Sequence, residues 1–176
     1  MKYISTRGSD GPLSFEEALL NGLARDGGLY LPVEWPSFTK AEITAMRGKS
    51  YVEIAGLIMS HFTEGELTKE QLTQMADEAY CDFTHKDIAP LKSIESDIHI
   101  LELFHGPTIA FKDYAMQFLS RAFDASLSRQ NRHAVILGAT SGDTGSARLR
   151  PFAGVMRWMC LFCFPMGGYR QYSKSR

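Results

Sequence analysis

His105-Gly-Pro-Thr-Ile-Ala-Phe-Lys112-Asp113 joins an apolar run to a helical pattern, and the fold class depends on that junction. Before it, Ile98-His-Ile-Leu-Glu-Leu-Phe104 has the branched, apolar composition that predicts a buried strand. After it, the spacing predicts a helix from about Asp113 to Leu127, and the residues expected to face the core are Met116, Leu119, Ala122 and Phe123. A second strand follows at Ala134-Val-Ile-Leu137. The order strand, helix, strand predicts a parallel α/β sheet.

Lys112 is the candidate reactive residue in this junction. A lysine that forms an imine must lose its proton, and burial favours the neutral amine. The apolar residues that would supply such a setting are Ala110, Phe111, Tyr114 and Ala115. A lysine in the first helical turn that reaches solvent and pairs with Asp113 fits the same residues, because lysines usually lie at the surface. The residues alone leave both interpretations open.

The loop Gly138-Ala-Thr-Ser-Gly-Asp-Thr-Gly145 follows the second predicted strand. Three glycines leave several backbone N–H groups accessible near the start of the next expected helix, which is the arrangement that binds anions. A tight turn capped by an Asp or hydroxyl side chain fits equally well. The loop is not a Walker loop, a dinucleotide-binding fingerprint or a nucleophile elbow.

The first 85 residues form a mainly helical region with four capping boxes, in which a Ser or Thr and a Glu or Gln three positions later satisfy each other's backbone donors. The pairs are Ser14/Glu17, Thr39/Glu42, Ser50/Glu53 and Thr68/Gln71. The first predicted helix presents Phe15, Ala18, Leu19 and Leu23 on one face, and Asp26-Gly27-Gly28 ends it. A short extended piece, Leu29 to Leu31, then stops at Pro32.

Composition excludes several classes of protein. A net charge of -1 over 176 residues argues against a nucleic-acid partner. No window approaches the roughly 18 apolar residues of a membrane span, and the N-terminus lacks a signal peptide, so we expect a cytoplasmic protein without a membrane partner. Three cysteines suggest a reduced compartment. Cys160-Leu-Phe-Cys163 lacks a second ligand pair, so we expect no metal site.

Four segments in this order resemble the threonine synthase family of pyridoxal-phosphate enzymes. They are Met1 to Gly8, Phe15 to Pro32, His105 to Asp113 and Gly138 to Ala147. The resemblance implies an α/β protein of fold type II, like the tryptophan synthase β chain. It implies a family-specific N-terminal domain over residues 1–85 and the beginning of an incomplete PLP-binding catalytic domain over 86–147.

The same resemblance implies a site. Lys112 would be the catalytic lysine that forms the Schiff base with pyridoxal 5'-phosphate. The loop Ser141, Gly142, Asp143, Thr144 and Gly145 would hold the substrate's carboxylate, with Asp143 also near the cofactor ring. The substrate would be O-phospho-L-homoserine, which reacts with water to give L-threonine and phosphate. His105 would be a polar contact nearby or a structural histidine. Two alternatives stay open: another fold type II PLP-dependent lyase, and a non-catalytic threonine-synthase-like fragment.

Residues 148–176 depart from the pattern. Residues 1–147 hold 13 basic and all 20 acidic residues, whereas the tail holds 6 basic residues and no acid. Arg148-Leu-Arg-Pro151 would interrupt a helix, and we expect neither the family's third strand nor its phosphate-binding loop. Restoring one nucleotide near codon 147 permits the reading Ala-Ala-Ile-Glu-Ala-Phe, then Asp-Val-Phe-Ile-Leu-Phe-Pro. We interpret the tail as a frameshift product and expect the chain itself to be inactive. A basic tail that docks on an acidic partner is the alternative.

Overall fold

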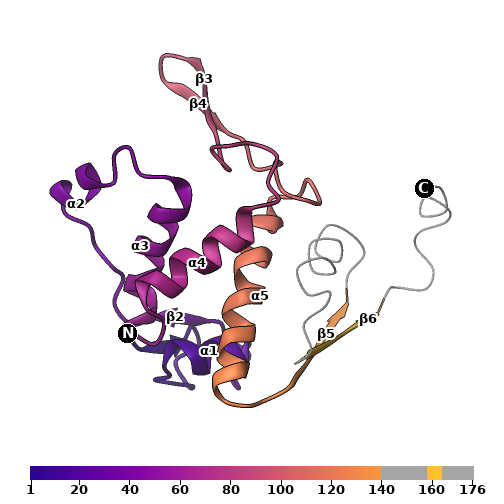
Figure 1. The fold of residues 1–176 in the computed structure, drawn as a ribbon. Helices are drawn as coiled ribbons and strands as arrows, with labels where there is room; N and C mark the ends of the chain where they lie inside the picture. The colour runs from indigo at the N-terminus through magenta and orange to yellow at the C-terminus, as the bar shows by residue number, and fades with distance from the viewer. Residues whose placement is uncertain (140–157, 164–176) are drawn as a thin grey trace, which may run out of the picture.

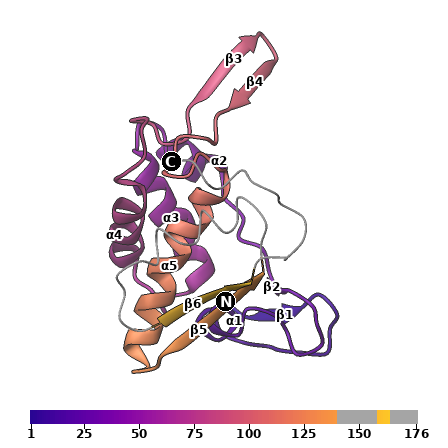
Figure 2. The same cartoon turned by 90° about the vertical axis from the view of Figure 1, so that its right-hand side faces the viewer.

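The computed structural model describes residues 1–139 and 158–163 (Figure 1). In chain order the elements are β1 (Tyr3–Ser5), α1 (Phe15–Asn21), β2 (Tyr30–Pro32), α2 (Lys40–Ala45), α3 (Tyr51–Thr63), α4 (Lys69–Tyr80), β3 (Leu91–Glu95), β4 (Ile98–Leu101), α5 (Lys112–Arg129), β5 (Ala134–Ala139) and β6 (Trp158–Cys163). Helices α3, α4 and α5 lie together, the β3–β4 hairpin projects beyond one end of α5, and β5 with β6 lies at the other end (Figures 1 and 2). Among the described helices none is long and apolar enough to cross a membrane.

All four predicted capping boxes are confirmed, and they open α1, α2, α3 and α4. The first helix nevertheless ends earlier than predicted, at Asn21, because Gly22 takes a φ of 71°. Leu23 therefore lies outside the helix and is 66% exposed, so its predicted place on that helix face was wrong. Asp26 shapes the following turn instead of ending the helix, since its carboxylate accepts bonds from Ser5 Oγ and from the backbone N–H of Gly28.

The hydrophobic core lies between α3, α4 and α5. Gly56 in α3 lets α4 approach closely, since a Cβ there would lie 2.1 Å from Thr73 Oγ1 and 3.0 Å from the Thr73 backbone. Tyr80 packs edge-on against Tyr51 and Phe83 at ring-centroid distances of 5.2 Å. The buried members of the core are Leu67, Leu72, Met75, Ala76, Ala79, Tyr80, Ile88, Phe118 and Ala122.

The long helix before the second strand is confirmed as α5, but its buried face is rotated from the predicted one. Ala122 is buried as expected, together with Phe118 and Leu127. Met116, Leu119 and Phe123 are only partly buried. The polar residues Gln117, Ser120 and Ser126 occupy the buried side, so apolar periodicity alone pointed to the wrong stripe.

The strand pairing differs from the prediction in two ways. Ile98 and its neighbours pair antiparallel with β3 in a hairpin, and every residue of both strands is exposed, Ile98 by 52%. The predicted buried strand is therefore wrong for the described residues. The parallel pair is formed by β5 and β6, with Ala134 opposite Trp158. The tail thus contributes the third strand that we did not expect. Six consecutive apolar residues are typical of a parallel strand, which shows no alternation.

Candidate active site around Lys112

Lys112 is the first residue of α5, and the loop from His105 to Phe111 leads into it. No side chain caps this helix, unlike the four before it. The Lys112 ammonium lies 5.2 Å from the centroid of the Phe111 ring, within the range of a cation–π contact. The side chain is partly exposed. An aldehyde could therefore reach Nζ.

The apolar setting predicted for Lys112 does not form among the described residues. Phe111 is 61% exposed and Ala115 is exposed. Tyr114 turns inward, where its ring packs against Phe83 at 4.9 Å. Residues three apart share one face of a helix, so Lys112 and Ala115 lie together on an open face while Tyr114 points to the core. Of the two interpretations that the sequence left open, the described residues leave Lys112 partly exposed.

Asp113 is completely buried and holds the loop before Lys112. Its Oδ2 accepts a hydrogen bond from the Thr108 backbone N–H at 2.7 Å, and its Oδ1 accepts one from Thr108 Oγ1 at 2.8 Å. Gly106 leaves room for this carboxylate, because a Cβ there would lie 2.5 Å from Asp113 Oδ2. Between them Ile109 takes a φ of 65°, which is unfavourable for a β-branched residue. The loop is thus fixed in a conformation that its sequence disfavours locally.

Glu102 fixes the other end of the loop. It is only 8% exposed, and its two oxygens bond Lys92 Nζ at 2.6 Å and His105 Nε2 at 2.8 Å. The hydrogen bond from Lys92, and then the one from His105, lower the pKa of this carboxyl group. The His105 ring packs against the rings of Phe104 and His85 at 4.7 and 4.9 Å. His105 is therefore a satisfied structural histidine within the described residues.

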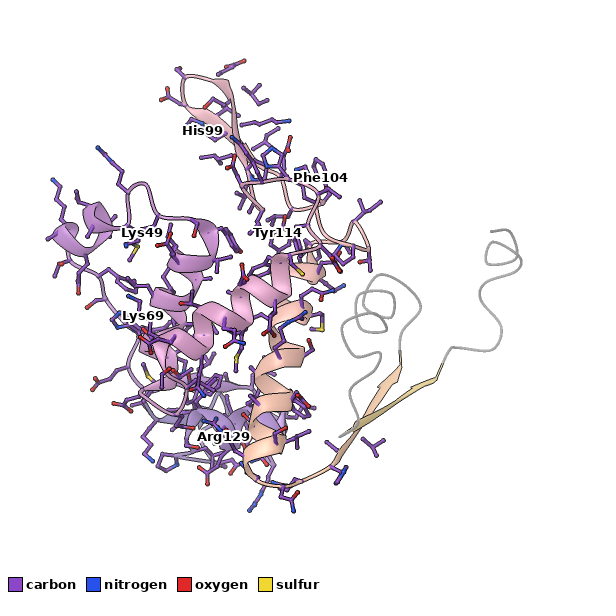
Figure 3. All side chains as sticks on the ribbon, in the orientation of Figure 1. Lys49, Lys69, His99, Phe104, Tyr114 and Arg129 are labelled. Atoms are coloured by element: carbon purple, nitrogen blue, oxygen red, sulfur yellow. The ribbon has the colours of Figure 1, made fainter. Side chains whose placement is uncertain are left out.

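Two tyrosines tie the start of α5 to the rest of the helical layer. Tyr114 Oη donates to the backbone carbonyl of Ile88 at 2.7 Å, and Tyr80 Oη donates to the carbonyl of Tyr114 at 3.0 Å. Burial raises the pKa of Tyr80, so its hydroxyl remains a donor. Figure 3 shows Tyr114 at the start of α5 and His99 on the hairpin.

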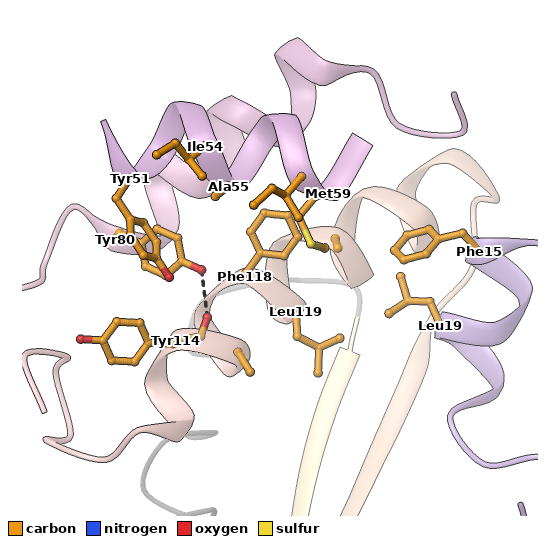
Figure 4. A pocket seen from close by; sticks show the side chains of 13 residues that line it. Phe15, Leu19, Tyr51, Ile54, Ala55, Met59, Tyr80, Tyr114, Phe118 and Leu119 are labelled. Carbon is orange, nitrogen blue, oxygen red and sulfur yellow. Dashed lines mark hydrogen bonds between the residues drawn. The ribbon is translucent and has the colours of Figure 1, made fainter. Parts of the chain in front are cut away.

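An apolar groove of about 500 Å³ runs along α5 from Tyr114 and faces α1 and α3 (Figure 4). Lys112 and its loop do not line it. Its lining residues are Phe15, Leu19, Tyr51, Ile54, Ala55, Ile58, Met59, Tyr80, Tyr114, Ala115, Phe118, Leu119 and Ala122. The groove and the lysine are thus separate features of α5.

Comparison with known proteins shows which proteins this chain is similar to. Residues 2–80 match the family model of the threonine synthase N terminus. A threonine synthase of Schizosaccharomyces pombe is 43% identical over 176 residues, covering 95% of this chain and 34% of its own length. One of Pseudomonas aeruginosa is 47% identical over 149 residues, covering 85% of this chain and 32% of its own length. The PLP-bound threonine synthase of Brucella melitensis superposes with a TM-score of 0.89 at 50% identity, covering 95% of this chain and 36% of that structure.

The chain belongs to the threonine synthase family. It spans about a third of the length of the threonine synthases that it matches. The likeness to solved threonine synthases confirms the predicted fold class, a partial α/β structure of fold type II.

The predicted threonine synthase site remains a prediction. Lys112 is described, but the predicted substrate loop, Ser141, Gly142, Asp143, Thr144 and Gly145, lies outside the described residues. Strand β5 ends at Ala139, two positions before Ser141 in the sequence, and its carboxyl end lies at one edge of the parallel pair. Ligands of open α/β sheets bind at that edge. Among the described residues no group of His, Cys, Asp and Glu could hold a metal ion.

Sequence reasoning missed the residues that hold the lysine's loop. The missed residues are Glu102, Thr108 and Asp113. The signal available for Asp113 was a carboxylate in the first turn of a helix that lacks a Ser or Thr cap. The signal for Glu102 was a single acid within an otherwise apolar run. Neither signal identifies a bonding partner, so the network required the structure.

Proposed function

We propose that this chain supplies the lysine-bearing part of a threonine synthase, which converts O-phospho-L-homoserine and water to L-threonine and phosphate. Lys112 would carry pyridoxal 5'-phosphate covalently. The loop from Ser141 to Gly145 would bind the substrate's carboxylate through its backbone N–H groups, with Asp143 near the cofactor ring. One observation carries the proposal: a single accessible lysine stands at the start of α5 on a loop fixed at both ends.

The residues around Lys112 fit such a cofactor. The primary amine is accessible, and its loop is held by the buried carboxylates of Glu102 and Asp113. Bound there, the cofactor would supply an electron sink for the substrate's carbon atoms. The similarity to a PLP-bound relative at 50% identity supports the same cofactor for this chain.

Lys112 has two roles in the proposed reaction. It would hold the cofactor between turnovers. Its amine would also serve as the proton carrier for the substrate's carbon atoms. The overall sequence is removal of the Cα proton and then a Cβ proton, loss of phosphate from Cγ, return of one proton to Cγ, addition of water at Cβ, and return of one proton to Cα. The fixed loop keeps the amine within reach during these steps.

Borohydride trapping tests the cofactor assignment. The chain is incubated with pyridoxal 5'-phosphate, reduced with borohydride, digested and mapped by mass spectrometry. We expect one pyridoxyl group, on Lys112. Lys112→Arg should abolish the adduct, whereas the matched control Lys69→Arg, at an exposed helix start, should retain it. Labelling spread over the exposed lysines of the unmodified chain would overturn the assignment.

Product analysis tests the reaction. Native protein isolated from its source cells should convert O-phospho-L-homoserine to equal amounts of threonine and phosphate. Another lyase of this fold would release phosphate without forming threonine, and that result would contradict the proposal. The intact mass of the same preparation shows whether it exceeds the 19.7 kDa of the 176-residue chain.

We further propose the domain limits 1–85 and 86–147, and a shifted reading frame as the source of residues 148–176. The match to Pseudomonas aeruginosa threonine synthase covers 85% of this chain, whereas the match to the Schizosaccharomyces pombe enzyme covers 95% and so extends into the tail. Strand β6, which lies within the tail, nevertheless pairs with β5. Sequencing the DNA across codons 145 to 150 decides the question, because a confirmed frame with no alternative continuation refutes the shift.

A further inference from the structure

The loop before Lys112 is restrained more strongly than a surface loop requires. A buried carboxylate is costly unless its oxygens are hydrogen-bonded, and Asp113 directs both of its oxygens back to Thr108. These bonds bridge the loop from a point four residues before Lys112 to the residue after it. Lys112 thus lies within the chain segment that these hydrogen bonds close into a ring.

This ring holds a strained residue. Ile109 has a φ of 65° and is 72% exposed, so no burial of its side chain compensates for the strain. Gly106 is buried against Asp113, where any side chain would collide with the carboxylate. Without the bonds to Thr108, the loop would relax toward a conformation that suits Ile109, and the backbone before Lys112 would turn.

We propose that Asp113 is a positioning residue for Lys112. By accepting both donors of Thr108, it keeps Ile109 in the left-handed region and fixes the direction in which Lys112 leaves the first turn of α5. The arrangement places Nζ over the Phe111 ring. The consequence for catalysis rests on the proposed role of Lys112, whereas the positioning itself can be measured without cofactor.

The test measures the acetylation rate of each lysine in the full chain with acetic anhydride, followed by peptide mass spectrometry. Thr108→Val removes the hydroxyl donor and keeps the shape and the backbone donor. Thr108→Ser restores the hydroxyl and serves as the matched control. Freed from the Phe111 ring, Lys112 should react about two- to fivefold faster in Thr108→Val and at the original rate in Thr108→Ser. The exposed Lys49 and Lys69 should not change.

An unchanged Lys112 rate in a Thr108→Val chain whose circular dichroism matches the original would overturn the proposal. Equal acceleration at Lys49 and Lys69 would also overturn it, because it would mean general loosening instead of positioning. Trapping with pyridoxal 5'-phosphate separates the two proposals. If the unmodified chain gives no selective adduct on Lys112, the proposed function fails, while the acetylation result still decides the role of Asp113.

Discussion

Replacing Gly106 with alanine should destabilise the chain through one defined collision. A Cβ at this position would lie 2.5 Å from Cβ and Oδ2 of Asp113 and 2.9 Å from its Cγ. Carbon atoms pack at about 3.5 to 4.0 Å, so the two side chains must separate by about 1 Å. All three close contacts belong to the Asp113 side chain, which already bonds Thr108.

The size of the effect follows from what the collision breaks. A shift of about 1 Å would lengthen both bonds to Thr108, now 2.7 and 2.8 Å, beyond the hydrogen-bonding range. Each bond to a charged group contributes about 1.5 to 3 kcal/mol, and overpacking costs about 1 to 3 kcal/mol. Because the chain relaxes by the cheaper route, which is overpacking, we expect Gly106→Ala to lower the free energy of unfolding by about 1 to 3 kcal/mol.

Urea unfolding followed by far-ultraviolet circular dichroism measures this loss, with an unchanged m-value as the sign that the same structure unfolds. An Asp113→Gly background provides the control, because it removes all three contacting atoms. In that background Gly106→Ala should cost less than about 1 kcal/mol. Equal costs in both backgrounds would refute the collision as the cause.

Three further predictions test other parts of the structure. Glu102→Gln should destabilise the chain at neutral pH, because the folded-state pKa of Glu102 is lowered. The difference in unfolding free energy between the variant and the original chain should be full above about pH 4.5 and should vanish as the pH falls through the lowered pKa. A difference that persists in acid contradicts this prediction. Gly56→Ala should cost about 1 to 2 kcal/mol in urea unfolding, because overpacking against Thr73 exceeds the gain in helix propensity; Thr73→Ala should recover part of it. Ser50→Ala should cost about 1 kcal/mol through the lost cap of α3, and an unchanged unfolding midpoint would contradict this.

The sequence predicted features that depend on neighbours along the chain. The four capping boxes need only two residues three positions apart, and all four form. The long helix α5 and the strand β5 also follow from local pattern. The pairing of strands was harder to predict. The segment that begins at Ile98 has the composition of a buried strand, but a turn of two residues after Glu95 lets it pair with β3 in a hairpin.

The prediction of the buried face of α5 failed for a different reason. Periodicity assigns the core to apolar residues, yet Gln117, Ser120 and Ser126 are buried here. The Ser120 hydroxyl bonds the Gln117 carbonyl of its own helix at 2.8 Å, which makes its burial tolerable. A pattern that ranks residues by polarity cannot include such local compensation, and so it placed Met116 and Phe123 on the core side instead.

The setting of Lys112 was the least predictable feature, because desolvation depends on the whole tertiary environment. Four apolar neighbours in sequence suggested burial, but a helix start distributes neighbours over opposite faces, and Tyr114 turns to the core while Phe111 stays exposed. What the local chain does supply is direction: Asp113 and Glu102 fix both ends of the loop. An imine-forming lysine needs direction and a free amine. The described residues provide the first through Asp113 and Glu102, and they leave the Lys112 amine accessible.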